Sequence, residues 1–370
     1  MTAGAAAALA AAYTHGPGRL VEPGESPRTP AAEGPRVPLT ALPGRFGAAV
    51  ARLLVDVATP LRWEPWNQYN DHRAYPSARA AATVDLVLAV GARRWPLDPV
   101  RRALVGDRPP ALDGPVRVEL VRRRDRLSPG YREFGDVLTE LEVGHVAAAL
   151  VERAAQVGLV ARAEGLTVSL AFAGPAEPPP LPRRSSGSGP RGIAADPRPL
   201  PRGTLDAVVR AVNHPPAGSP VRDDLRHRLA VRNVEGVADG WYAVTGGLRL
   251  VEPGPALPSL QAVFGHPPGT IHLASMNLAL VTTGDPAAAV AGDGPDGYRA
   301  LLRAAGATAQ HVCTAAAHAG AFCRPARSTH DGPLEALAGA PASHSLLYLL
   351  LLGRPRGAGF AYDLTPLEAR

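Results

Sequence analysis

A turn that carries a hydroxyl and a guanidinium precedes one of the clearest strand patterns of the chain. The turn spans residues 76–79 in the stretch "AYPSARAAATVDLVLAV", and the apolar run 84–90 follows it. A run of this kind, bounded by a turn and by Gly91, predicts a buried strand. Ser77 offers a hydroxyl and Arg79 a guanidinium at the mouth of that strand, so the turn is the first candidate for a binding site.

Several other kinds of chemistry are disfavoured by the residue types. The chain has no lysine, which excludes a Walker A loop, and no Gly-x-Gly-x-x-Gly stretch opens a helix after a strand. Cys313 and Cys323 lack the paired spacing of a zinc site and are expected to be small buried side chains. His311 and His318 are seven residues apart without nearby ligands, so we expect no metal site.

The composition is that of a globular protein with long irregular connections. The 370 residues include 40 prolines and 39 glycines, and the formal net charge is +6. The arginines are scattered, and the one dense run, "RRRDR", lacks interleaved aromatic residues, so we expect no nucleic-acid partner. The apolar run "SLLYLLLLG" is too short to span a bilayer and predicts a core strand. Two cysteines and no cationic start of a signal peptide favour a cytoplasmic location.

A segment rich in proline, glycine and serine divides the chain. We expect an N-terminal extension at 1–36, a first half at 37–174, a linker or exposed excursion at 175–203 and a second half at 204–370. Each half repeats an order of helix, strands and a long helix. The predicted helices are 45–58, 141–159, 204–212 and 304–322, and the predicted strands are 84–90, 116–124, 228–236, 276–284 and 345–353.

The two halves also share a short motif. The stretch "GYREF" precedes the first long helix and "GYRAL" precedes the second, which favours an internal duplication. A hairpin is expected where Tyr242–Val244 and Leu248–Val251 flank a Thr-Gly-Gly turn. Strands and helices in mixed order with hairpin connections favour an α+β fold in which helices sandwich a mixed sheet.

The order of these stretches resembles the nitroreductase-like flavoproteins. It runs from "AAAYTHGPGRL" through "VPLTALPGRF", "YPSARAAATVDLVLAV", "VRNVEGVADGWYAV" and "GYRALLRAAGATAQHVCTAAAHAGAF" to "LLYLLLLGRPR". The branch it is most similar to is the SagB and McbC type, which oxidises azoline rings in ribosomally made peptides. The resemblance implies an α+β fold that binds FMN between two subunits, or between two fused halves that form a pseudo-dimer.

The resemblance also implies where the cofactor is held. Pro76, Ser77 and Ala78 match a family turn that lies near the flavin ring, while Arg79 replaces its glycine. Arginines hold the flavin phosphate in this family, and a planar bidentate guanidinium suits that role. The candidates for that role, each of which could equally be a solvated side chain, are Arg73, Arg324, Arg327 and Arg354.

The long helices match a family pattern of Glu-Ala-Gly-His followed by Gln-Asn, each only in part. The first helix keeps Glu142, Gly144 and His145, whereas the second keeps Gly306 and Gln310. In the second helix the family's Glu, His and Asn are replaced by Ala304, Ala307 and His311. The division suggests halves with different duties, and independent decay of both sites is the alternative.

The catalytic base is less clear, because the family's Lys-Tyr pair has no counterpart in "AGDGPDGYR". Removal of a proton beside an azoline nitrogen needs a base within hydrogen-bond reach. The candidates left are Tyr298, Tyr242, His145, His311 and Asp296.

Three functions are compatible with the sequence. The first is an FMN-dependent dehydrogenase that converts thiazolines or oxazolines of a precursor peptide to azoles. The second is a degenerate scaffold that binds the peptide or joins cyclodehydratase subunits, which the missing Lys-Tyr pair and Arg79 favour. The third is a reductase of small nitro compounds or quinones.

Overall fold

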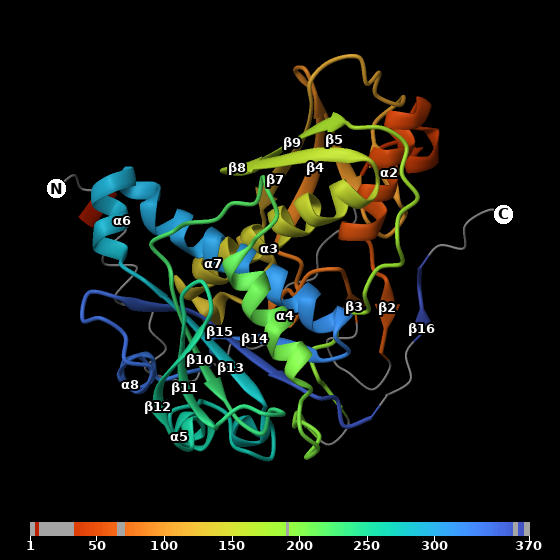
Figure 1. The fold of residues 1–370 in the computed structure, drawn as a ribbon. Coiled ribbons are helices and arrows are strands. Elements are labelled where there is room, and N and C mark those ends of the chain that lie inside the picture. The colour runs from red at the N-terminus through yellow and green to blue at the C-terminus, as the bar shows by residue number, and fades with distance from the viewer. Residues whose placement is uncertain (1–3, 7–32, 65–70, 190–191, 358–361, 366–370) are drawn as a thin grey trace.

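Two large antiparallel sheets lie on either side of a pair of crossed helices (Figure 1). The computed structural model describes residues 4–6, 33–64, 71–189, 192–357 and 362–365. The predicted N-terminal extension falls largely on residues 7–32, which lie outside this description. Among the described residues, no helix is both long and apolar enough to cross a membrane.

The first half contributes two helices and a seven-stranded sheet in the order β1-β6-β5-β4-β7-β9-β8. The helices are α2 (Gly44–Ala58) and α3 (Phe134–Gln156). The strands of the sheet are β1 (Arg36–Pro38), β4 (Val84–Val90), β5 (Arg93–Asp98), β6 (Ala103–Val105), β7 (Val116–Arg122), β8 (Leu159–Glu164) and β9 (Thr167–Phe172). A small third sheet joins β2 (Arg62–Trp63), β3 (Asp71–His72) and β16 (Tyr362–Asp363).

Within its described residues, the second half contributes five α-helices and a six-stranded sheet in the order β12-β11-β10-β13-β15-β14. The helices are α4 (Arg202–Asn213), α5 (Ala256–Ala262), α6 (Pro286–Asp293), α7 (Gly297–His318) and α8 (Asp331–Leu337). The strands are β10 (Arg226–Val231), β11 (Gly240–Val244), β12 (Leu248–Pro253), β13 (Leu278–Gly284), β14 (Phe322–Ala326) and β15 (Ser345–Gly353).

The two halves repeat one topology. The order β5-β4-β7-β9-β8 in the first sheet matches β11-β10-β13-β15-β14 in the second. Helix α3 connects β7 to β8, and α7 connects β13 to β14 in the same way. Three predicted elements are confirmed closely: the strands β4 and β15 and the helix α2. The predicted duplication of an α+β fold is therefore confirmed, although both long helices begin several residues earlier than expected.

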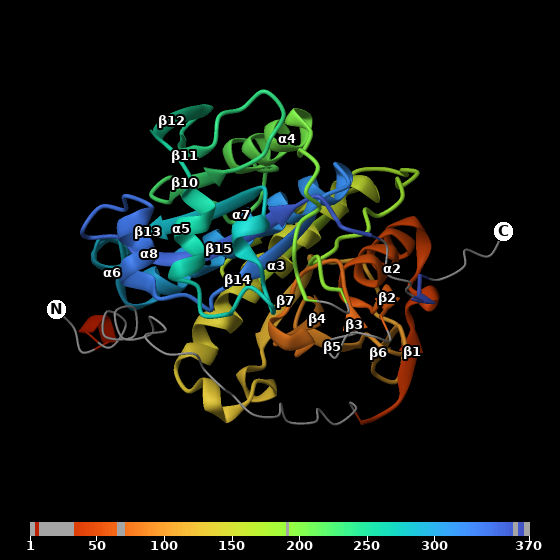
Figure 2. The same ribbon diagram turned by 90° about the horizontal axis from the view of Figure 1, so that it is seen from below.

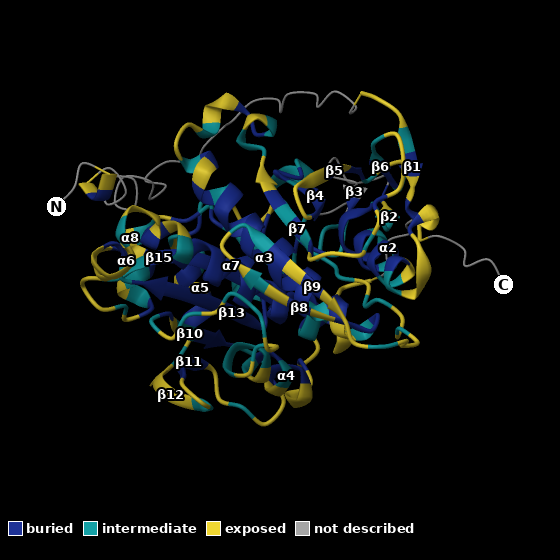
Figure 3. Cartoon of the chain, turned by 90° about the horizontal axis from the view of Figure 1, so that it is seen from above, coloured by how far each residue is buried: buried dark blue, intermediate teal, exposed yellow. Residues whose placement is uncertain are grey.

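Burial explains why these segments form the elements they do. Strand β4 is an inner strand that pairs with β5 and β7 on its two edges, and nearly all of its residues are buried (Figure 3). The first sheet packs its core against α2 and α3. The second sheet is covered on both faces, by α4 and α7 on one face and by α5 and α8 on the other (Figure 2). Continuous apolar runs are typical of such doubly covered strands.

The crossing of α3 and α7 brings the two halves closest together. A methyl group at Gly144 would lie 2.0 Å from the carbonyl oxygen of Arg303, and one at Gly306 would lie 2.1 Å from the carbonyl oxygen of Leu141. These two contacts are reciprocal. Leu141 corresponds to Arg303 in the repeat and Gly144 corresponds to Gly306, because both pairs are separated by the same number of residues. Only a residue without Cβ permits such close approach of two helix backbones.

Part of the predicted linker packs against the second half. The N–H of Cys323 donates to the carbonyl of Ser185, which therefore lies beside the edge strand β14. Ile193, Ala195 and Leu200 are buried. The N–H of Ile193 donates to the carbonyl of Thr270. These residues are thus held in place by the second sheet and its loops.

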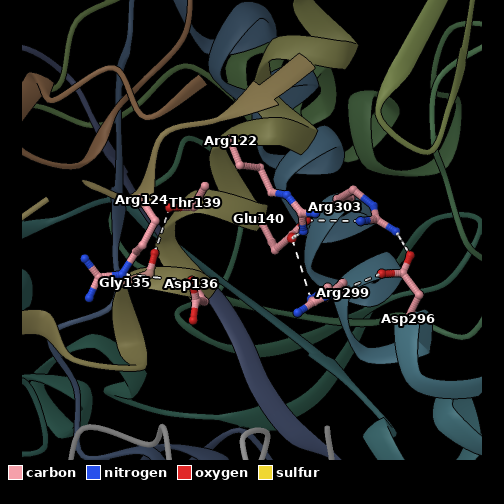
Figure 4. A network of polar contacts seen from close by, with 9 residues as sticks. All are labelled: Arg122, Arg124, Gly135, Asp136, Thr139, Glu140, Asp296, Arg299 and Arg303. Atoms are coloured by element: carbon pink, nitrogen blue, oxygen red, sulfur yellow. Dashed lines mark hydrogen bonds and ion pairs between the residues drawn. The ribbon is translucent and has the colours of Figure 1, made fainter. Parts of the chain in front are cut away.

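An ion-pair cluster ties the two halves beside the crossing (Figure 4). The buried carboxylate of Glu140 on α3 lies 2.5 Å from Arg122 Nη1 and 3.1 Å from Arg303 Nη1. Arg299 lies 3.8 Å from the same carboxylate, and Arg303 also pairs with Asp296. One buried carboxylate therefore holds guanidinium groups from both halves.

Substitution of Gly144 by Ala should separate the crossed helices. The added methyl would collide with backbone, which cannot move without shifting α7. We expect the free energy of unfolding to fall by roughly 1–3 kcal/mol in urea titrations. The control is Gly203→Ala in α4, where a methyl group meets nothing within 4 Å, so it should stay within about 1 kcal/mol of the unsubstituted chain. Equal losses in both variants would contradict the close crossing.

Removal of the charge of Glu140 should destabilise the joined halves. In Glu140→Gln the arginines lose their shared buried counter-ion, and we expect a loss of about 3 kcal/mol in the free energy of unfolding. The control Asp136→Asn lies on the same helix, and its largely exposed carboxylate is 3.9 Å from Arg124. That control should change stability by less than about 1 kcal/mol. A small effect of both variants would show that the cluster contributes little.

Candidate functional site

The serine-bearing turn is tied to helix α3 by hydrogen bonds. Ser77 Oγ donates to Glu142 Oε2 at 2.7 Å and accepts from the N–H of Ala82 at 2.8 Å. Three non-glycine residues of this turn adopt left-handed backbone angles, with φ of 53° at Arg79, 54° at Ala80 and 51° at Ala82. Such conformations cost free energy and concentrate at functional sites.

The carboxyl of Glu142 has one satisfied oxygen and one that is not. Thr83 Oγ1 also donates to Oε2, at 2.9 Å. The other oxygen, Oε1, is buried and has no hydrogen-bond partner within the described parts of the chain. Burial raises the pKa of Glu142 to about 6, although the Ser77 and Thr83 hydroxyls oppose this effect. Glu142 was matched to a family motif in the sequence, but its contact with Ser77 was not foreseen.

His145 lies one turn further along α3 and contacts two residues of the second half. Its Nδ1 lies 3.3 Å from Gln310 Oε1, and its Nε2 lies 3.1 Å from the hydroxyl of Tyr348. The Gln310 amide nitrogen faces the carbonyl of Ala74 and the hydroxyl of Thr314, so its oxygen is the acceptor toward His145. His145 then donates from Nδ1 and accepts at Nε2. Burial lowers its pKa to about 3, so the imidazole is neutral.

A continuous polar chain connects His145 with His311. Thr314 accepts from Gln310 and donates to Glu152 Oε2 at 2.9 Å. Glu152 Oε1 lies 2.5 Å from His311 Nδ1. These side chains of α3 and α7 thus form one hydrogen-bonded network across the crossing, with members from both halves.

A cleft opens beside the turn and Glu142. It holds about 780 Å³ of empty space, part of which is open to solvent. Its walls come from the turn, the start of α3, the loop after α5 and the end of β14. The lining residues are Pro76, Ser77, Ala78, Arg79, Tyr131, Phe134, Leu138, Glu142, His145, Phe264, His266, Ile271, Arg324, Pro325, Ala326, Arg327, Ser328 and Tyr348.

The wall carries more positive than negative charge. Arg79, Arg324 and Arg327 are its guanidinium groups, and Glu142 is its carboxyl. Arg327 forms a two-pronged pair with Asp331, with both distances 3.0 Å, while its buried Nε has no partner among the described residues. Arg324 Nη1 donates to Ser188 Oγ at 3.2 Å.

Aromatic rings form another part of the wall. Tyr131 precedes α3 and Phe134 begins it, and Phe264 and His266 follow α5 with ring centres 5.6 Å apart. A flat heterocycle with an anionic group matches a cleft that presents both rings and guanidinium groups.

The sequence-predicted site residues separate into two groups. Those that line the cleft are Ser77, Ala78, Arg79, His145, Arg324 and Arg327. Gln310 does not line the cleft but hydrogen-bonds to His145, which does. Arg73 donates to the hydroxyl of Tyr75 at 3.2 Å, next to the serine turn. His311 pairs with Glu152 on the far side of this network.

Three further predicted residues lie outside the cleft wall and outside this network. The hydroxyl of Tyr242 donates to the carbonyl of Ala238 at 2.8 Å. Tyr298 is buried at the start of α7, where burial raises its pKa to about 12. Arg354 donates to the carbonyl of Pro199 at 3.3 Å. The order of motifs along the sequence does not predict where these side chains point, because their directions depend on tertiary packing.

Several residues of the wall were not predicted. Tyr348 completes the polar part, and Phe264 and His266 complete the aromatic part. Thr83, also not predicted, donates to Glu142 without lining the cleft. Tyr348 had a signal in the sequence, because its hydroxyl interrupts the otherwise apolar run after Ser345. Phe264 and His266 follow α5, which has no counterpart in the first half.

The equivalent place in the second half is closed. In the first half, the serine turn precedes β4 and faces β14 across the cleft. In the repeat, β10 corresponds to β4 and β8 corresponds to β14, and the stretch before β10 contacts β8 directly. The N–H of Ala163 donates directly to the carbonyl of Gly218 at 2.8 Å. A methyl group at Gly218 would lie 2.4 Å from the carbonyl oxygen of Ala161. Backbone therefore occupies this position in the second half.

Comparison with solved structures shows the nitroreductase fold. A protein from Anabaena variabilis assigned as a nitroreductase matches with a TM-score of 0.75 and 15% identity, over 96% of this chain and 100% of that chain. The prediction of a nitroreductase-like fold in two halves is confirmed by this match. At this level of identity the likeness concerns the fold alone.

Two further structures match over about half of this chain. The Escherichia coli microcin synthetase McbBCD complex, solved with truncated pro-MccB17, has a TM-score of 0.39 and 19% identity over 47% of this chain and 71% of that chain. An FMN-dependent nitroreductase from Clostridium difficile has a TM-score of 0.33 and 14% identity over 51% of this chain and 92% of that chain. No family model and no curated protein matches the chain.

The burial of His145 predicts a pH dependence of stability. Its folded-state pKa lies below the ordinary 6.5, so its contribution is present above pH 6.5 and is lost as the pH falls toward 3. Between pH 4 and 6 the unfolded chain binds about one proton more at this residue. As the pH is lowered from 6 to 4, the free energy of unfolding should therefore fall less steeply for His145→Gln than for the unsubstituted chain. The two slopes should differ by about 1.4 kcal/mol per pH unit.

Urea unfolding at several pH values measures this difference in slope. The slope is informative even if the substitution lowers stability at every pH. The control is His318→Gln, at the exposed end of α7, which should leave the slope unchanged. Parallel curves for the unsubstituted chain and His145→Gln would contradict a neutral, buried imidazole.

Proposed function

We propose that the chain is an FMN-dependent oxidoreductase that oxidises azoline rings of a ribosomally made peptide. The observation that carries this proposal is the cleft, which combines the serine turn, three guanidinium groups and a set of aromatic rings within a nitroreductase fold. Similarity of fold alone supports a function only loosely, so the proposal depends on these side chains.

The residues present fit FMN. Its phosphate needs cationic donors, and the cleft wall presents the guanidinium groups of Arg79, Arg324 and Arg327. Arg327 is already paired with Asp331, but its buried Nε has no hydrogen-bond partner among the described residues. When bound, FMN would supply the acceptor for a two-electron oxidation.

The side chains of the cleft would then have distinct duties. The arginines would bind the phosphate, and the turn around Ser77 would set the position of the ring by its backbone. Tyr131, Phe134, Phe264 and His266 would exclude water from one side and offer surfaces for a flat substrate ring. Neutral His145 would orient Tyr348 in the wall, since both of its ring nitrogens are engaged.

The peptide substrate is proposed on two grounds. The sequence order resembles the azoline-oxidising branch, and the microcin synthetase complex that matches in part was solved with a truncated pro-peptide. The open cleft could admit a ring carried on an extended chain. Cyclodehydratase subunits, which would form the azoline, are the partners this reaction requires.

Uptake of FMN tests the proposal directly. The purified chain, incubated with FMN and then freed of excess, should retain one FMN per chain, because the equivalent position in the second half is closed. Arg324→Ala should weaken FMN binding by about 10-fold to 100-fold, since a charge-assisted hydrogen bond would be lost. The measurement is fluorescence titration of the flavin.

Riboflavin and a second variant serve as controls. Riboflavin lacks the phosphate, so its affinity should be the same for Arg324→Ala and for the unsubstituted chain. Arg354→Ala, outside the cleft, should bind FMN normally. A colourless protein that takes up no FMN would contradict the proposal and favour the scaffold that binds peptide without a flavin.

A further inference from the structure

The cleft has three buried groups that could exchange a proton, and two of them are unsuited to it. Both ring nitrogens of His145 are engaged, and its pKa of about 3 keeps it neutral. Burial holds the pKa of Tyr348 well above its usual range, so its phenol stays protonated. The remaining buried group is the carboxyl of Glu142.

The surroundings of Glu142 favour an exchangeable proton at one oxygen. Oε2 accepts from two hydroxyls, those of Ser77 and Thr83. Oε1 is buried beside the cleft without a donor from the described chain, although a buried carboxylate oxygen ordinarily has one. A carboxylic acid at Oε1 would instead present a donor to a molecule in the cleft.

The other charged and titratable groups near Glu142 leave it as the buried proton acceptor of the cleft; His266, whose pKa burial lowers, lines the cleft as a half-buried side chain. Arg73 lies close enough to favour the carboxylate form, although burial outweighs its effect on the pKa of Glu142. Tyr75 beside the turn and Tyr348 on β15 are neutral, because burial raises the pKa of each. Arg79, on the turn, lines the same cleft.

We propose that Glu142 is the proton-exchanging group of the cleft, with Oε1 as the atom that takes up and releases the proton. The inference rests on the proposed function. Conversion of an azoline to an azole removes two electrons and two protons from two ring C–H bonds, and FMN would accept both electrons together with one of the protons as hydride. The other proton would pass to Oε1, so one ring C–H bond breaks and an O–H bond forms.

The carboxylate is regenerated when this proton passes to water through the open side of the cleft. A pKa of about 6 suits such a cycle, because the carboxylate predominates at pH 7 and yet remains a useful base. Glu142 would thereby take the role for which this chain has no lysine.

The titration of Glu142 can be followed in the protein without a ligand. In carbon-13 NMR of protein labelled at glutamate carboxyls, one signal should titrate with a midpoint near pH 6 and be missing in Glu142→Gln. In Thr83→Val that midpoint should move upward by about one pH unit, because a donor to the carboxylate is lost. Thr83→Val also keeps the test valid if Glu142→Gln does not fold.

Glu152→Gln is the matched control for this titration. Glu152 lies on the same helix but faces His311 and Thr314 and does not line the cleft. Its replacement should leave the signal near pH 6 in place. A glutamate signal that persists in Glu142→Gln, or a Glu142 midpoint at the ordinary value for glutamate, would overturn the inference.

Exchange with the ligand is tested with FMN as the probe. The reduction potential of bound FMN, measured against pH, should change slope near the midpoint of Glu142 in the unsubstituted chain and should show no such change in Glu142→Gln. Identical curves would overturn the proton exchange. If the chain binds no FMN, the proposed function fails, and the NMR titration alone decides whether Glu142 holds the proton.

Discussion

The close crossing of α3 and α7 is the constraint on which the rest of the structure depends. Gly144 and Gly306 let the two backbones approach at reciprocal points, where any side chain would collide with a carbonyl oxygen. Glu142 and His145 flank one glycine, and Gln310 follows the other by one helical turn. The distance between the helices therefore sets whether His145 reaches Gln310 and whether the cleft has polar groups from both halves.

The duplicated scaffold explains why the two halves differ in chemistry. Glu142 and His145 correspond to Ala304 and Ala307 across the crossing, so these two polar groups of α3 have no polar counterparts on α7. The contact between Gly218 and β8 fills the position equivalent to the cleft. The cleft needs residues of both halves, because Tyr348 and the end of β14 from the second half form part of its wall. The second half can therefore contribute to one site without having a site of its own.

Much of the fold could be predicted because the signals are local. Strands β4 and β15 are apolar runs bounded by turn residues, and α2 has a clear amphipathic pattern. The start of α3 was missed because Phe134–Glu140 mixes apolar and acidic residues, and tertiary contacts of Glu140 with arginines stabilise it there. The role of Glu142 depends on Ser77, which lies 65 residues away, and no local pattern encodes such a contact. Tyr242 and Tyr298 were expected at the site from their types, but packing directs them into the core.

A crystal structure of the chain grown with FMN tests the central claim most directly. The account predicts density for a single flavin in each chain, between the serine turn and the end of β14, with its phosphate against one or more of Arg79, Arg324 and Arg327. Flavin density at Gly218, or a cleft that stays empty while FMN lies elsewhere, would contradict it.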